Sequence, residues 1–250
     1  MSERTEAITP AQGGRGVLAG AFALLEQLTH SDEVGLSELA RTAGVPKSTA
    51  YRLLGQLVAE GAVERRAGRY RLGPRVFRLG QTWQPAHLLR TASAEPMRQL
   101  AARGRHGTYA VAVADRGRIM IVGAIGRELD AVMPLRAGAL LPPGGAAAQI
   151  LSPTVTEYTP PEGISRAEWL RLTTAARARG LAYDMDIRRR GIVCVAAPVH
   201  GPEGEVVAAL GAATLEPHRL TAMADPVQRA AGVMTANLAR LLRTRRSLSL

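Results

Sequence analysis

One stretch of the sequence decides the fold of the N-terminal part of the chain: SELARTAGVPKSTAYRLL, residues 37–54. We expect a short helix that is capped by Ser37 and ended by Gly44, because glycine readily adopts the left-handed conformation that a turn requires. Pro46 then begins a second helix, where its missing N–H is tolerated. Ala40 is small enough for the two helices to cross closely. This spacing predicts a helix-turn-helix.

The flanking segments complete the N-terminal unit. Apolar residues recur at helical spacing from 17 to 28 and predict a preceding helix. The second helix of the motif would span 46–60, and two short strand-like pieces follow at 62–66 and 69–72. Three helices and a hairpin predict a winged helix-turn-helix over residues 15–73, preceded by a flexible tail over 1–14.

Positive charge is concentrated in the same region. The chain has 250 residues, with 32 Lys and Arg against 21 Asp and Glu and a formal net charge of +11. Lys47 is the only lysine, so codon bias toward arginine could account for part of this excess. However, residues 41–78 hold nine cations and two acids, which is +7 of the total. Such clustering predicts binding to a polyanion.

The second helix of the motif presents cations and hydroxyls away from its leucine face. These are the groups that contact phosphates and base edges in the major groove of DNA. The arginines of the hairpin would lie against the backbone or the minor groove. A solvated basic face on a three-helix packing unit is the alternative. The candidate DNA contacts are Lys47, Ser48, Thr49, Tyr51, Arg52, Arg65, Arg66, Arg69 and Arg71.

The composition excludes several classes of protein. A single cysteine, Cys194, rules out an intrachain disulfide framework, and five scattered histidines give no metal-ligand spacing. We therefore expect no metal site, and we also expect no cofactor and no catalytic residues. The first fourteen residues lack the apolar core of a signal peptide. The uncharged stretch 137–156 is broken by Pro and Gly, so it predicts no membrane span. A cytoplasmic, nucleoid-associated protein is expected.

The remainder of the chain has a different pattern. A weak helical stripe predicts a linker helix over 74–92, and residues 93–250 predict an α+β domain with an antiparallel sheet and flanking helices. Ser165 and Glu168 form a capping box at the start of one helix. The expected strands are 108–114, 118–123, 193–199 and 206–214, and the expected helices are 165–180 and 220–243.

Two stretches carry a resemblance to a known family. Residues 36–65, LSELARTAGVPKSTAYRLLGQLVAEGAVER, and 68–80, GRYRLGPRVFRLG, resemble the winged helix-turn-helix and linker of IclR-type transcriptional regulators. The resemblance continues at RGLAYD, 179–184, and GIVCVAAPV, 191–199, and covers about residues 15–245. It implies a homodimeric or homotetrameric regulator, more often a repressor, that binds a pseudo-palindromic operator. It also implies that Ser37 touches a phosphate.

The resemblance further implies a GAF-like C-terminal domain that binds a small organic or aromatic metabolite. The lone Cys194 could instead be a small buried hydrophobe, and Asp184 a solvated loop carboxylate beside 188–190. The positions that match the family's effector pocket are Leu129, Val132, Leu140, Ala146, Ala147, Asp184, Ile192, Cys194, Gly211 and Ala213.

The chain departs from the family pattern in this region. The usual His and Gly-Lys stretch is replaced by PGGAAAQ, 143–149, and two positions that often carry hydroxyls are Gly211 and Ala213. A carboxylate would lose hydrogen bonds there, so we expect a less polar or bulkier effector than a small keto acid. A ligand-independent or architectural DNA-binding protein and a GAF-like enzyme are the alternatives, although no Ser/His/Asp arrangement is visible.

Overall fold

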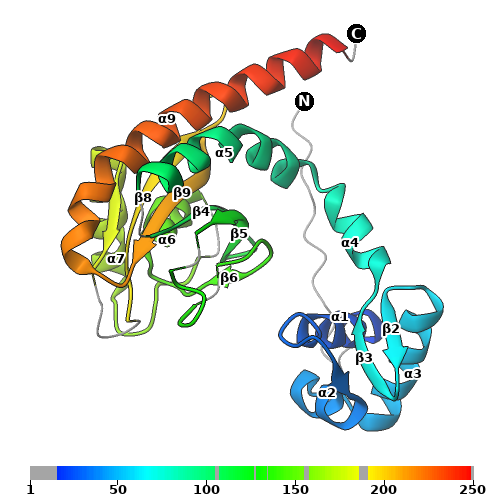
Figure 1. Cartoon of the computed structure of the whole chain (residues 1–250). Helices are drawn as coiled ribbons and strands as arrows, with labels where there is room; N and C mark the ends of the chain where they lie inside the picture. The colour runs from blue at the N-terminus through cyan, green and yellow to red at the C-terminus, as the bar shows by residue number, and fades with distance from the viewer. Residues whose placement is uncertain are drawn as a thin grey trace. The chain divides into compact units, whose positions relative to one another are not determined.

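The computed structural model describes residues 16–104, 107–126, 128–133, 135–154, 158–185 and 191–248. The chain folds into two compact units, residues 1–83 and 84–250. The tail predicted over 1–14 lies outside the described residues. The fold is α+β, as the sequence predicts, and each unit has its own core and its own antiparallel sheet (Figure 1).

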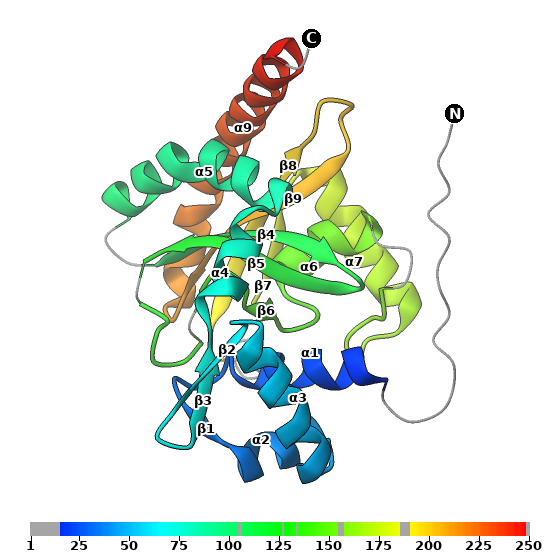
Figure 2. The same cartoon turned by 90° about the vertical axis from the view of Figure 1, so that its right-hand side faces the viewer.

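The first unit is a three-helix cluster with a small sheet. Its core is built from Leu24, Leu39, Leu53, Leu54 and Tyr70, all of which are buried. The three strands pair in the order β1-β3-β2, and the hairpin β2–β3 forms the wing (Figure 2). The elements are α1 (Val17–Gln27), β1 (Val34–Gly35), α2 (Leu36–Ala43), α3 (Lys47–Ala59), β2 (Val63–Arg66), β3 (Arg69–Leu72) and α4 (Pro74–Gln81).

The turn of the helix-turn-helix has the predicted conformation, but the predicted cap is wrong. Gly44 follows α2 in the left-handed region, with φ of +63°. Ser37 does not cap α2, because the helix begins one residue earlier, at Leu36. The segment before the helix pairs with β3 through Val34 and Gly35, so the chain enters the helix directly from a strand. Ser37 is an exposed residue of the first turn.

The second unit is a six-stranded antiparallel sheet with the order β6-β5-β4-β9-β8-β7. Helices α5 and α9 pack together on one face, and α6 and α7 cover the other (Figures 1 and 2). The strands are β4 (Thr108–Asp115), β5 (Arg118–Ile125), β6 (Leu140–Leu141), β7 (Ala182–Asp184), β8 (Val193–His200) and β9 (Val206–Thr214). The helices are α5 (Gln84–Arg103), α6 (Ala146–Leu151), α7 (Arg166–Arg179) and α9 (Pro217–Leu248).

Residues of different size occupy the two faces of this sheet. On β4, Tyr109, Val111 and Val113 point into the core beneath α5 and α9. On the opposite face, Ala112 lies among the residues packed against α6 and α7, together with alanines of β8 and β9. Because side chains alternate along a strand, β4, β8 and β9 turn mainly small residues to the face of α6 and α7, where Ile119 of β5 is a larger neighbour. The small-residue face leaves room beneath α6.

Most of the predicted elements of this unit are confirmed. The hairpins β4–β5 and β8–β9 form, and the Ser165 hydroxyl accepts a hydrogen bond from the Glu168 amide at 3.2 Å. The segment predicted as a linker, 74–92, is divided between the units: α4 belongs to the first and the start of α5 to the second. Ala86 and Leu89 of α5 are buried in the second core, which holds this part of the helix in the second unit.

Candidate DNA interface and effector pocket

The leading turns of α3 are amphipathic in the way the sequence predicts. Ala50, Leu53 and Leu54 are buried in the core of the first unit. The helical period of 3.6 residues therefore turns the polar side chains outward. Lys47, Ser48, Tyr51 and Arg52 are exposed, and Thr49 is half-buried.

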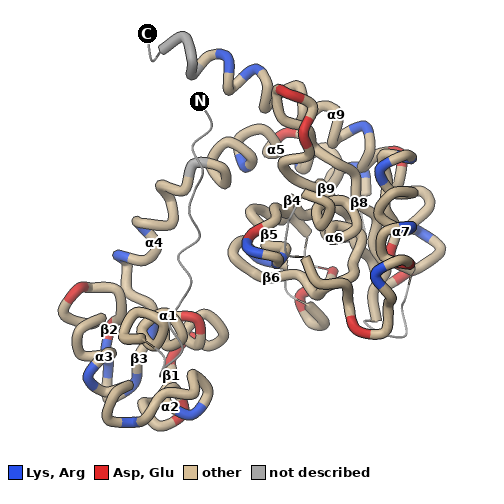
Figure 3. Tube along the Cα trace, turned by 180° about the vertical axis from the view of Figure 1, so that it is seen from behind, with Lys and Arg blue, Asp and Glu red and all other residues tan. Residues whose placement is uncertain are grey.

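The two cations of α3 are not engaged by other described parts of the chain. Across the described residues, Lys47 and Arg52 form neither an ion pair nor a hydrogen bond through their side chains. Figure 3 marks Lys and Arg positions on α3 and on the wing. Exposed cations that lack acidic neighbours attract phosphates most strongly, because no ion pair has to be broken first.

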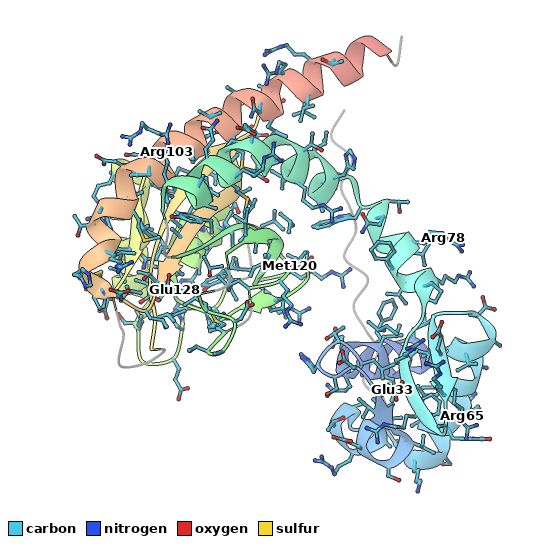
Figure 4. All side chains as sticks on the ribbon, in the orientation of Figure 1. Glu33, Arg65, Arg78, Arg103, Met120 and Glu128 are labelled. Carbon is cyan, nitrogen blue, oxygen red and sulfur yellow. The ribbon has the colours of Figure 1, made fainter. Side chains whose placement is uncertain are left out.

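The four wing arginines have different surroundings. The Arg71 guanidinium is ion-paired with the Glu64 carboxylate at 2.6 Å, and this hydrogen bond and charge raise the pKa of Arg71. The guanidinium carbon of Arg65, labelled in Figure 4, lies 5.6 Å from the centre of the Tyr70 ring. This cation–π contact holds the Arg65 stem against the unit. Arg71 is therefore the wing arginine least available to another anion.

Arg66 and Arg69 are directly opposite each other at the end of the hairpin. Arg69 also donates a hydrogen bond to the backbone carbonyl of Glu33 at 2.7 Å. Like charges directly opposite on a sheet are destabilising. The Glu33 carboxylate lies 3.9 Å from the Arg69 guanidinium and partly neutralises it, whereas Arg66 is exposed, so Arg66 is the arginine at this end of the wing that best suits a phosphate backbone.

A cavity lies in the second unit, on the small-residue face of the sheet and next to α6. Its volume is about 60 Å³. Strands β4, β8 and β9 form its floor, and Met133, Leu135, Leu141 and Pro142 add apolar walls. Thr108 and Cys194 are the polar side chains of the lining. A concave, mostly apolar pocket with few polar groups is typical of a small-molecule site.

Six of the ten predicted effector residues line this cavity and four do not. The lining six are Ala146, Ala147, Ile192, Cys194, Gly211 and Ala213. Leu140 and Val132 are exposed, with 46% and 53% of their surface accessible. Their neighbours Leu141 and Met133 take the positions at the wall instead. Because alternate strand residues face opposite sides, a shift of one residue along β6 exchanges Leu140 for Leu141.

Leu129 and Asp184, the other two, are not part of the lining, although each contacts a residue that is. Leu129 is fully buried and packs with Ile192 and Ala213. The Asp184 carboxylate is 4.0 Å from the Cys194 sulfur. The alternative for Asp184 was a solvated carboxylate beside residues 188–190. Those residues lie outside the described part of the chain.

The Glu128 carboxylate fixes the segment that carries Met133. Its Oε1 atom accepts hydrogen bonds from the Thr214 hydroxyl at 2.8 Å and from the Leu215 amide at 3.1 Å. This ties the segment after β5 to the end of β9 (Glu128 is labelled in Figure 4). Burial, with Glu128 as the smaller cause, raises the pKa of Tyr109.

Sequence reasoning missed Thr108 as a cavity residue. Thr108 begins β4 and lines the cavity with Ala110 and Ala112. The strict alternation along this strand was the available signal, because it places Thr108 on the face opposite Tyr109. However, the sequence does not indicate which face of this strand borders a cavity.

The described residues include neither a metal-binding cluster nor a membrane-spanning helix. His, Cys, Asp and Glu side chains gather nowhere in groups of three or more that could hold a metal ion. In the same residues no helix has the length and apolar character that a membrane crossing demands.

Comparison with known proteins identifies the chain. Residues 17–67 match the IclR helix-turn-helix domain, and residues 86–232 match the Bacterial transcriptional regulator IclR C-terminal domain. The chain belongs to the IclR family of transcriptional regulators. It is a DNA-binding regulator with an effector-binding C-terminal domain, and the family is one of transcriptional regulators rather than of enzymes.

Individual relatives agree with this family. The chain is 32% identical to the Glycerol operon regulatory protein of Streptomyces griseus, over 78% of this chain and 82% of that protein. It is 26% identical to the HTH-type transcriptional regulator XynR of Escherichia coli, over 73% and 79% of the two chains. An IclR homolog from Microbacterium hydrocarbonoxydans, solved in complex with 4-hydroxybenzoate, shares the fold with a TM-score of 0.74 at 24% identity, over 89% of this chain and 99% of that one.

Proposed function

We propose that α3 enters the major groove of its operator and that the wing lies on the flanking backbone. On α3, Lys47, Ser48, Thr49, Tyr51 and Arg52 contact bases and phosphates. Arg65, Arg66, Arg69 and Arg71 of the wing and Ser37 at the start of α2 contact phosphates. The observation that carries this proposal is the exposed face of α3, whose Lys47 and Arg52 have no partner within the described residues.

The regulator acts as a homodimer or a homotetramer. The first unit exposes large apolar side chains on α1 and α4, including Leu18, Phe22, Phe77 and Leu79. Exposed apolar side chains gathered on single elements are typical of surfaces that bind another protein. Two copies related by a two-fold axis would read a pseudo-palindromic operator, whose half-sites lie about 10 base pairs apart or a multiple of that.

A small organic or aromatic metabolite, bound in the cavity of the second unit, changes the affinity for DNA. The apolar lining supports such a ligand. The IclR homolog of the same fold that was solved in complex with 4-hydroxybenzoate, an aromatic molecule, supports this proposal. We propose repression as the regulatory mode, relieved or strengthened by the metabolite, and the cytoplasmic nucleoid as the place of action.

Selection of bound duplexes from a random library, followed by binding measurements, tests the proposed DNA contacts. Paired half-sites are the expected product. Lys47→Ala and Arg52→Ala are each expected to weaken binding to the selected duplex by about 1–3 kcal/mol without unfolding the protein. Arg171→Ala, an exposed arginine of α7 in the second unit, is the control. Unchanged affinity for both α3 variants would refute the assignment of α3 as the reading helix.

A further inference from the structure

Thr108 is a buried polar residue whose hydroxyl the described part of the chain leaves unsatisfied. Only 2% of Thr108 is exposed, and its Oγ1 atom has no hydrogen-bond partner among the described residues. Buried hydroxyls are normally hydrogen-bonded, because burial without a partner is unfavourable. Thr108 also lines the cavity. An unsatisfied hydroxyl at a cavity wall marks a place where a bound molecule can complete a hydrogen bond.

The sheet register places Thr108 in a row of cavity residues. Thr108 of β4 is paired with Ala213 of β9, which is paired with Cys194 of β8, and Cys194 is paired with Asp184 of β7. Residues paired across antiparallel strands project to the same face of the sheet. Adjacent strands are about 4.8 Å apart, so Thr108 and Cys194 are separated by about 10 Å across the cavity floor.

The rest of the lining determines the charge of a compatible ligand. The lining contains apolar side chains, Thr108 and Cys194, and within the described residues it includes neither Lys, Arg nor His. Next to the lining, the Asp184 carboxylate lies 4.0 Å from the Cys194 sulfur. An anion in this cavity would lose its hydration without gaining a cation from the described lining, and it would lie near a carboxylate. A neutral molecule avoids both costs.

We infer that the cavity binds an uncharged, mainly apolar molecule, an alcohol, phenol or ketone, whose polar group hydrogen-bonds to Thr108 Oγ1. A threonine hydroxyl can donate to a ketone or accept from an alcohol or phenol. The small side chains at Gly211 and Ala213 leave Thr108 as the hydroxyl on this floor. This inference rests on the proposed effector role of the cavity, and it makes Thr108 a specificity-determining residue.

Calorimetric titration of the full-length protein with phenol and with benzoate tests the charge preference. The two probes share one ring and differ in charge at neutral pH. Phenol is expected to bind more tightly than benzoate. Thr108→Val, which replaces the hydroxyl by a methyl group, is expected to weaken phenol binding by about 3- to 10-fold. Thr108→Ser keeps a hydroxyl and is expected to retain the affinity for phenol.

Thermal unfolding of the unliganded variants separates a binding role from a structural one. Thr108→Val removes an unsatisfied buried hydroxyl, so its melting temperature is expected to stay equal or to rise. Thr173→Val is the matched control, because Thr173 is 3% exposed and its hydroxyl donates to the Leu170 carbonyl at 3.0 Å. This control is expected to melt at a lower temperature and to bind phenol normally.

Several outcomes would overturn the inference. Tighter binding of benzoate than of phenol, no binding of phenol at millimolar concentration, or equal phenol affinity in wild type and Thr108→Val would each do so. Measuring operator binding in the presence of each probe distinguishes failure of the inferred ligand class from failure of the proposed effector role. If benzoate alone alters DNA affinity, the ligand class is wrong and the effector role stands. If phenol binds through Thr108 without altering DNA affinity, the effector role fails and the ligand class stands.

Discussion

The two arginines that face each other on the wing allow a quantitative test of backbone binding. Arg66 and Arg69 are Cα partners in the β2–β3 ladder, and Arg69 already donates to the Glu33 carbonyl. Each phosphate contact steepens the dependence of log affinity on log salt by about 0.9. A fourfold rise in salt therefore weakens binding by about 3.5-fold per contact. Arg66→Ala is expected to reduce the slope by about 0.9 for each bound subunit.

The same substitution is expected to leave the fold intact. Arg66 is exposed, forms no ion pair within the described residues and lies opposite a like charge that Glu33 only partly neutralises, so the free energy of unfolding should not fall. Fluorescence anisotropy of a labelled random-sequence duplex over a salt series gives the slope, and urea unfolding gives the stability. Arg171→Ala on α7 should change neither. An unaltered slope for Arg66→Ala would refute the placement of the wing on the phosphate backbone.

Three further predictions concern the second unit. The pKa of Tyr109 is raised above 10.0 in the folded chain, so the unfolded chain releases this proton first and stability falls as the pH rises through the folded pKa. Tyr109→Phe should remove that fall in urea unfolding measured from about pH 8 to 11, and coinciding curves for the two proteins would contradict it. Ser165→Ala loses the cap of α7 and should lower stability by about 1 kcal/mol in the same assay, whereas Ser165→Asp should retain it. Met234→Ala, on the buried face of α9, should cost about 2–5 kcal/mol, and a loss below 1 kcal/mol would argue against this packing.

Local signals in the sequence were sufficient for much of the fold. Gly44 marks the turn between α2 and α3, and it adopts the left-handed conformation that the prediction requires. Ser165 and Glu168 mark the start of α7 through a hydrogen bond between near neighbours. These features depend on residues a few positions apart, so their spacing alone determines them.

Features that depend on distant pairing could not be predicted in this way. The sequence predicts Ser37 as the cap of α2, but the pairing of Gly35 with Arg69 extends the preceding strand up to the helix. Arg71 has the same residue type as Arg66, and only the register of the hairpin shows that Glu64 engages it. Thr108 is a candidate ligand contact only because β4, β8, β9 and α6 enclose a cavity beside it. These elements are far apart in the sequence, so local spacing does not predict the cavity.

Photo-crosslinking from α3 is the most direct test of DNA recognition by this helix. A benzophenone amino acid replaces Ser48, which is exposed on the first turn of α3, in the full-length protein. This protein is then bound to its selected operator and irradiated. The same group at Arg171 of α7 serves as the control. Crosslinks from position 48 to bases within each half-site, with none from position 171, are the expected result. An operator complex that forms normally but gives no crosslink from position 48 would contradict insertion of α3 into the duplex.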